Sequence, residues 1–147
     1  MSLKRMTVVG AVTLAVLGAN VVAATGAAAS PTATIAKDGW CDTEEVCLYY
    51  NSNLGGGMLD VTYNLLTYVT EDFKCSLDGS GGLDICNGSG SSVWNNAASV
   101  RNKSRCDVVI YYNTGQRGPS QLIPRFSWAN LNATLKNNNA SHKFVNC

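Results

Sequence analysis

The chain has 147 residues and a formal net charge of +1, with 46% hydrophobic and 14% charged residues. This length allows one domain or two, and the low charged fraction excludes a coiled coil or a mainly disordered chain. So small a net charge gives no electrostatic reason to expect a nucleic acid or an anionic membrane as partner. The six cysteines are the most informative residues, because their meaning depends on the cellular compartment.

The N-terminal 29 residues are typical of a secretory signal peptide. A short, positively charged start precedes an apolar run, and the segment ends in a small-residue site at 27–29. The apolar run is too short and too diluted for a membrane anchor. We therefore expect a signal peptide over residues 1–29, a flexible mature N-terminus over 30–39 and one domain over 40–147. The mature protein is expected to be secreted, with no membrane attachment after cleavage.

All the cysteines lie in the mature part of the chain: Cys41, Cys47, Cys75, Cys86, Cys106 and Cys147. An even number of cysteines in a small exported chain predicts disulfides. A zinc site is disfavoured because no C-x-x-C pair exists and His142 is the only histidine. Six cysteines allow about fifteen pairings, among which the sequence does not choose. We favour Cys41–Cys47, Cys75–Cys86 and Cys106–Cys147.

Short β-rich runs begin after Trp40. Residues 46–50, 58–63 and 108–112 combine tyrosine with apolar and β-branched residues, and turn-forming residues bound them. Such runs predict strands. No window has a convincing helical period with caps, although residues 127–136 could form one short helical turn. The predicted class is therefore all-β, as a sandwich or a barrel.

The chain contains an internal repeat, with units over about 46–105 and 106–147 and an insertion near 67–91 in the first. Residues 48–59 match 110–121 at an offset of 62, and a second similarity follows at an offset of 42. The matched positions are Tyr49 with Tyr111, Gly56 with Gly118 and Ser99 with Ser141.

The repeated pattern has a specific physical meaning. An aromatic residue seven positions before a glycine can fold back over a hairpin and cover it. The glycine avoids a clash or supplies a positive φ, and a later serine can form a hydrogen bond to the hairpin. The alternative is a generic hairpin with Asn-Gly turn chemistry. Two copies, each followed by an Asn-rich stretch that ends in Ala-Ser, favour the specific motif.

These paired motifs resemble the Greek-key motifs of the βγ-crystallin fold. The Trp40-Cys41 opening, Cys47-Leu-Tyr and the later Asn-Asn-Ala-Ala-Ser-Val-Arg-Asn resemble secreted actinomycete metalloproteinase inhibitors with this fold. The resemblance covers residues 40–147. It implies a disulfide-stabilised, βγ-crystallin-like Greek-key sandwich of two repeated motifs. It also implies inhibition of an extracellular protease, of the thermolysin-like metalloproteinase kind, by a monomer.

The segment between Cys75 and Cys86 is the candidate inhibitory loop. Rigid inhibitors present an extended loop to a protease cleft, and covalent bracing lowers the ordering cost of binding. Leu77, Leu83 and Ile85 are the apolar candidates for a hydrophobic specificity pocket. The alternative is a surface insertion that is braced only for stability, and its three glycines argue against a stiff loop.

Two other binding functions remain open. Residues 95–100 and 137–142 match five positions of the crystallin calcium pattern and fail at the sixth, Val100 and His142. They offer amides, one hydroxyl and carbonyls but no carboxylate, so any calcium site would be weak. We therefore expect no metal and no cofactor. An antimicrobial or toxin-like role fits the same fold, but the chain lacks an amphipathic basic helix for membrane lysis.

An enzyme is not expected. His142 has no carboxylate nearby in the sequence and is expected to be exposed, whereas a hydrolytic triad needs an acid and a nucleophile beside it. The acidic pairs Glu44-Glu45 and Glu71-Asp72 are expected to be solvated loop charges. G-x-S-x-G, H-E-x-x-H and phosphate-binding glycine loops are absent from the sequence.

The tryptophans are expected to contribute to packing. They are Trp40, Trp94 and Trp128. Tryptophan combines a large apolar ring with one hydrogen-bond donor, so burial or half-burial is its usual state. An exposed pair would instead indicate carbohydrate binding.

Overall fold

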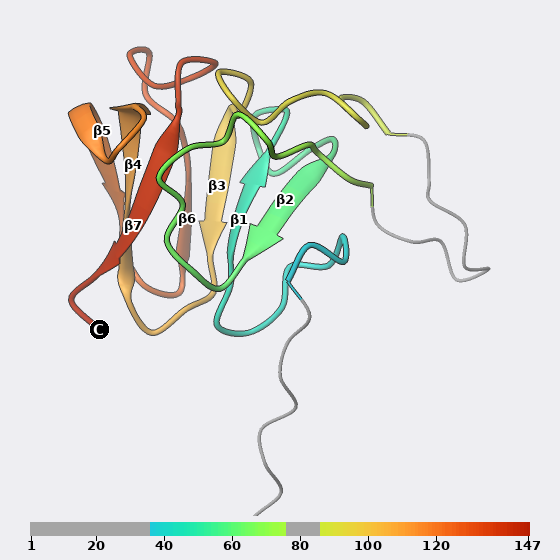
Figure 1. Cartoon of the computed structure of the whole chain (residues 1–147). Helices are drawn as coiled ribbons and strands as arrows, with labels where there is room; N and C mark the ends of the chain where they lie inside the picture. Colours follow the sequence, from blue (N-terminus) through green and yellow to red (C-terminus); the bar gives the residue numbers. More distant parts are fainter. Residues whose placement is uncertain (1–35, 76–85) are drawn as a thin grey trace, which may run out of the picture. The chain divides into compact units, whose positions relative to one another are not determined.

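Strands β1, β2 and β4 form from short apolar and β-branched runs in this computed structural model, which describes residues 36–75 and 86–147 (Figure 1). The strands of these described residues are β1 (Val46–Tyr49), β2 (Met58–Val61), β3 (Ser99–Asn102), β4 (Asp107–Asn113), β5 (Arg117–Ile123), β6 (Ser127–Asn130) and β7 (Ser141–Val145). They form one sheet in the order β2-β1-β3-β6 and a second in the order β5-β4-β7. The predicted all-β class is confirmed.

The two repeats build equivalent hairpins. In the first sheet, β1 is antiparallel to both β2 and β3, and Leu48 lies opposite Leu59 and Val100. In the second sheet, β4 is antiparallel to both β5 and β7, and Ile110 lies opposite Gln121 and His142. Leu48 and Ile110 are related by the offset of 62, so the sequence repeat is also a repeat of strand pairing.

Each repeat also contributes a segment to the sheet of the other. Strand β6 of the second repeat pairs with β3, so that Val100 lies opposite Ala129. Leu65 of the first repeat forms an isolated bridge with His142 in β7, and the His142 amide donates to the Leu65 carbonyl at 3.0 Å. The four-stranded sheet thus includes a strand of the second repeat, whereas all three strands of the other sheet come from the second repeat. The resemblance to the βγ-crystallin fold implied a Greek-key arrangement of this kind.

Side chains of both sheets form one apolar core. Strand β4 alternates buried and half-buried residues over its first five positions, with the period of two that a sheet requires. The fully buried members of the core include Val46, Leu48, Val61, Tyr68, Val93, Val100, Val108, Ile110, Ile123 and Leu135. Removal of this apolar surface from water is the main favourable contribution to folding.

The region 127–136 differs from the predicted helical turn. Its first part is strand β6, which is held at the sheet edge by its pairing with β3. Only the end of the region turns, where the Lys136 amide donates to the Asn132 carbonyl at 2.8 Å. The partner strand therefore decides the structure of residues 127–130. The described residues contain no helix that is long and apolar enough to cross a membrane.

The described part of the N-terminal segment is attached to β2. The Asp60 carboxylate accepts the amides of Asp38 at 2.9 Å and Gly39 at 3.2 Å, and the Asp60 carbonyl accepts the Lys37 amide at 2.8 Å. Asp60 is fully buried, and this burial raises its pKa. Residues 37–39 thus make defined contacts, whereas the boundary at residue 40 stays a prediction.

Three disulfides join the cysteines in the favoured pairing: Cys41–Cys47, Cys75–Cys86 and Cys106–Cys147. All six cysteines lie among the described residues, and none of them is free. The first two bridges close loops with sequence separations of 6 and 11, and the third spans 41 positions. A bridge over a longer loop removes more conformational freedom from the unfolded chain.

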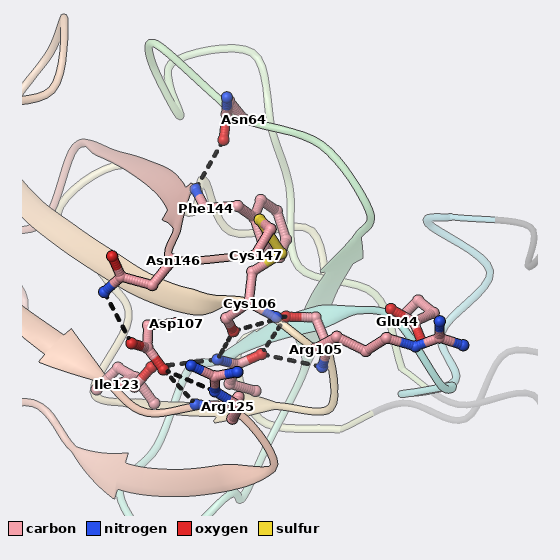
Figure 2. The surroundings of a disulfide bond; sticks show 12 residues. Glu44, Asn64, Arg105, Cys106, Asp107, Ile123, Arg125, Phe144, Asn146 and Cys147 are labelled. Carbon is pink, nitrogen blue, oxygen red and sulfur yellow. Dashed lines mark hydrogen bonds and ion pairs between the residues drawn. A yellow bond between two sulfur atoms is a disulfide. The ribbon is translucent and has the colours of Figure 1, made fainter.

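The third bridge attaches the last residue to the start of β4 (Figure 2). Asp107, the residue after Cys106, forms hydrogen bonds to two segments beside this bridge. Its carboxylate accepts the Asn146 side-chain amide at 3.0 Å and the Arg125 backbone amide at 3.0 Å. These bonds lower the pKa of Asp107. The C-terminus is therefore part of the second sheet.

Candidate functional site

The residues that flank the segment between Cys75 and Cys86 lie beside the start of β2. Met58 and Lys74 exchange two backbone hydrogen bonds, of 2.7 and 2.8 Å, and the Gly57 amide donates to the Asn87 carbonyl at 2.8 Å. The disulfide holds the Cα atoms of Cys75 and Cys86 5.8 Å apart. Both ends of the segment are thus fixed to the same sheet edge. We call these residues, 73–75 and 86–88, the stem.

Aromatic packing fixes the stem against the core. Phe73 is only 1% exposed, and the ring of Tyr50 meets it edge to face at a centroid distance of 5.5 Å. Gly88 lies directly under Tyr50, since a Cβ atom at this position would lie 2.2 Å from Tyr50 Cγ. The close approach requires glycine. The stem therefore has one packed position relative to β2.

The predicted inhibitory side chains, Leu77, Leu83 and Ile85, lie outside the described residues. Their contact role stays a prediction. The structure does bring together the two cysteines that flank them, of which Cys75 is 3% exposed. The sequence predicted this bracing but not the pairing of the stem with β2.

Each repeat has a turn between its first two strands, at residues 50–57 and 114–116, which we call the corner. The glycine and the serine predicted for each repeat lie at or beside these corners. Gly56 and Gly118 both have a positive φ, of 75° and 82°. The Ser99 hydroxyl donates to the Asn51 carbonyl at 2.6 Å and accepts the Leu54 amide at 3.0 Å. Ser99 therefore bonds to the backbone of the turn between β1 and β2.

The second corner repeats this geometry. The Ser141 hydroxyl donates to the Asn113 carbonyl at 2.6 Å and accepts the Gln116 amide at 3.0 Å. In both repeats the serine hydroxyl thus satisfies one carbonyl and one amide of the hairpin in its own repeat. The serines therefore have a structural role.

The predicted tyrosines lie at the ends of β1 and β4, Tyr49 buried and Tyr111 half-buried. The atoms that lie nearest to Gly56 and Gly118 do not belong to the rings of Tyr49 and Tyr111. The nearest atoms to a Cβ at Gly56 belong to Asn87, Asn51 and Tyr50, and those at Gly118 all belong to Asn113. The side-chain amide of Asn51 thus lies close to Gly56, and that of Asn113 lies close to Gly118.

The two calcium-pattern stretches have internal bonds. Besides the serine hydroxyls, the buried Asn139 amide donates to the carbonyls of Ala97 at 2.7 Å and Leu135 at 3.0 Å. Across residues 36–75 and 86–147, no group of three or more His, Cys, Asp or Glu residues is placed to hold a metal ion. The Asn139 amide nitrogen is thus engaged by two backbone carbonyls, whereas its Oδ1 is buried without a hydrogen-bond partner.

His142 is fully buried, which corrects the expectation of an exposed histidine. Its Nε2 donates to the Tyr63 carbonyl at 2.9 Å, and its Nδ1 accepts the Tyr68 hydroxyl at 3.0 Å. Burial lowers the pKa of His142 to about 4, so the ring is neutral at physiological pH. It packs and bonds as a core residue.

Two acidic residues also differ from the expected solvated charges. Glu45 is fully buried, and its carboxylate accepts the Asp42 amide at 2.7 Å. Burial raises the pKa of Glu45 to about 7. Glu71 is 7% exposed and forms an ion pair with Lys37 at 2.6 Å. Adjacent acidic residues on a strand or turn point in different directions, so one member of each pair turns inward.

The tryptophans are more exposed than expected, with 50% of Trp40, 44% of Trp94 and 53% of Trp128 accessible. The sequence did not predict this exposure, because a tryptophan by itself does not indicate whether its side chain faces the core or the solvent. The repeat held a signal: the offset of 42 aligns Trp94 with Lys136, a residue that belongs at the surface.

Comparison with solved structures supports the fold. A structure described as "Evolution of the eye lens beta-gamma-crystallin domain fold" is 16% identical, with a TM-score of 0.54, and the match covers 72% of this chain and 90% of the other. The N-terminal domain of protein S is 19% identical over 69% of this chain and 94% of the other, with a TM-score of 0.45. The first of these matches shows that the chain has a βγ-crystallin-like fold. A search of curated proteins with this chain found no match.

A family model gives the class. The model for peptidase inhibitor family I36 matches residues 35–123, so the chain belongs to this family. The protein is therefore a peptidase inhibitor by family and not an enzyme, and its partner is a protease. The three disulfides and the family together indicate an extracellular protein.

Proposed function

We propose that the protein inhibits thermolysin-like metalloproteinases and presents the segment between Cys75 and Cys86 to the protease cleft. Family membership supports an inhibitor. The observation that carries the choice of segment is the stem, whose ends are joined by a disulfide and bonded to Gly57 and Met58.

Bracing the ends matters because a free loop loses conformational entropy when it binds. Immobilisation of each flexible side chain and of the loop backbone opposes association. A stem that is already ordered removes part of this loss before the protease arrives. Leu77, Leu83 and Ile85 then supply the apolar side chains for a hydrophobic specificity pocket, and each buried side chain adds favourable transfer from water.

The same proposal covers export and assembly. Residues 1–29 act as a cleaved signal peptide, and the domain over 40–147 acts as a monomer. One inhibitor then occupies one protease cleft. The expected stoichiometry of inhibition is therefore one to one.

The test is a titration of thermolysin with the purified mature protein, with subtilisin and trypsin as serine-protease comparisons. Thermolysin activity should fall linearly to near zero at equimolar inhibitor. Leu77→Ala, Leu83→Ala and Ile85→Ala are compared singly, and at least one should weaken inhibition about tenfold or more, as an interface anchor does. Leu66→Ala is the matched control, because Leu66 is an exposed leucine outside the segment.

Two results would contradict the proposal. Thermolysin could digest the protein with no loss of its own activity, which would exclude inhibition. Alternatively, all three variants could inhibit as well as Leu66→Ala, which would move the contact to another surface.

A further inference from the structure

A hollow of about 360 Å³ lies where the turn after Val93 meets the end of β4. Its lining is Trp94, Asn95, Tyr112, Asn113, Thr114 and Ala140. This volume lies within the range of small-molecule sites. The hollow shares no residue with the stem or with the Cys75–Cys86 segment. We call it the Trp94 hollow.

The Trp94 hollow presents two accessible aromatic rings and a neutral polar set. Trp94 is 44% exposed and Tyr112 is 40% exposed. Within the described part of the chain, no hydrogen bond engages the side chains of Asn95, Asn113 or Thr114. Two amides and one hydroxyl are therefore available as donors and acceptors for a ligand. The lining holds no charged side chain.

The backbone of the hollow is already in place without a ligand. The Asn95 amide donates to the Asn139 carbonyl at 2.8 Å, and Asn95 has a φ of 61°. The Asn113 carbonyl accepts the Ser141 hydroxyl of the second corner. Both amide-bearing residues are thus fixed by the fold, and pre-organisation of this kind favours binding.

A twin hollow, lined by residues of both repeats, lacks the aromatic pair. It is lined by Tyr50, Asn51, Asn137 and Lys136, among others, which match Tyr112, Asn113, Asn95 and Trp94 at the offsets of 62 and 42. Lys136 stands where the Trp94 hollow has tryptophan. The ring of Tyr50 packs on Phe73 and Gly88, so it is committed to the stem. Of these two equivalent hollows, the Trp94 hollow is thus the one with two accessible aromatic rings.

We infer that the Trp94 hollow binds a pyranose unit of a neutral oligosaccharide. A pyranose has apolar C–H faces that lie against aromatic rings and a rim of hydroxyls that need paired donors and acceptors. Trp94 and Tyr112 supply the rings, and the asparagine amides and Thr114 supply the polar partners. A charged ligand would find no opposite charge in the lining. This site is independent of protease inhibition.

The test measures binding of chitotetraose and cellotetraose to the mature protein by isothermal titration calorimetry and tryptophan fluorescence. At least one should bind saturably. Trp94→Lys, which copies the twin hollow, and Trp94→Ala should each lower the affinity about tenfold or more, and Trp94→Phe should restore part of it. Trp128→Ala is the matched control, because Trp128 on β6 is also an accessible tryptophan, 53% exposed, outside the hollow. Thermolysin inhibition should be unchanged in every variant.

The inference is overturned if neither oligosaccharide binds the wild-type protein. It is also overturned if Trp94→Ala binds as tightly as wild type, or if Trp128→Ala loses as much affinity. Melting temperatures of the variants show that each one is folded. Since inhibition is measured on the same samples, failure here and failure of the proposed function are distinguishable.

Discussion

Two buried ionisable residues titrate in opposite directions in this domain. Burial raises the pKa of Glu45 from 4.5 to about 7, and burial lowers the pKa of His142 from 6.5 to about 4. Between pH 4.5 and 6.5 the folded protein keeps Glu45 protonated and His142 neutral, whereas the unfolded chain does the reverse. Each side chain is therefore in its uncharged form in the core.

The pH dependence of stability follows from proton uptake. As pH rises from 4.5 to 7, unfolded Glu45 releases a proton that the folded state keeps, so the contribution of Glu45 to stability falls. As pH falls from 6.5 to 4, unfolded His142 takes up a proton that the folded state refuses, so the contribution of His142 falls. Between pH 4.5 and 6.5 the two slopes oppose each other and largely cancel.

Replacement of Glu45 by glutamine should leave the contribution of His142 to the pH dependence of the free energy of unfolding without its opposing partner. Glu45→Gln keeps the shape of the protonated acid but cannot titrate. Relative to wild type, its free energy of unfolding should rise with pH by about 1.4 kcal/mol per pH unit between pH 4.5 and 6.5, which corresponds to one proton. Urea unfolding at several pH values measures this. Parallel curves for the two proteins would show that Glu45 titrates normally.

The sequence could not predict the state of these residues, because their environments come from distant parts of the chain. His142 bonds to Tyr68 and Tyr63, which are 74 and 79 positions away. The neighbours of His142 in the sequence are polar and suggested exposure. Glu45 lies in a run of acidic residues, but its position before β1 places it inside. The repeated glycines and serines were predictable because each recurs at a fixed offset.

Strands of the domain divide into those with a clear sequence signal and those without. Parts of β1, β2 and β4 were predicted, because runs of valine, leucine and tyrosine favour strands. Strands β3, β5, β6 and β7 were not, since partner strands rather than composition hold them. Strand β5 contains Gly118 and Pro119 and lies at the edge of its sheet, where proline is tolerated.

The contact between Tyr50 and Gly88 can be tested with a matched pair of glycines. Gly88 and Gly90 have positive φ values of 87° and 73°, so both alanine variants share the backbone strain. A Cβ at Gly88 would clash with Tyr50, whereas nothing lies within 4 Å of one at Gly90. Gly88→Ala should therefore destabilise by about 1–3 kcal/mol more than Gly90→Ala. Thermal unfolding measures both. Equal losses would mean that the stem does not pack on Tyr50.

At the scale of the whole molecule, two of the three disulfides lie at different places in the fold. The Cys106–Cys147 bridge attaches the chain end to β4, and the Cys75–Cys86 bridge closes the stem. In our account the Cys106–Cys147 bridge stabilises the fold, and the Cys75–Cys86 bridge also orders the ends of the inhibitory segment. The class of protein follows from the family, whereas the choice of contact segment rests on the different roles of these two disulfides.

The most direct measurement is therefore a thermolysin inhibition titration with two double variants. Cys106→Ser/Cys147→Ser should lower the melting temperature, since loss of such a bridge typically costs about 2–5 kcal/mol, yet it should inhibit like wild type below that temperature. Cys75→Ser/Cys86→Ser should remain folded, with the other two bridges intact, and should lose about tenfold or more in inhibition. Full inhibition by the folded Cys75→Ser/Cys86→Ser protein would contradict the account.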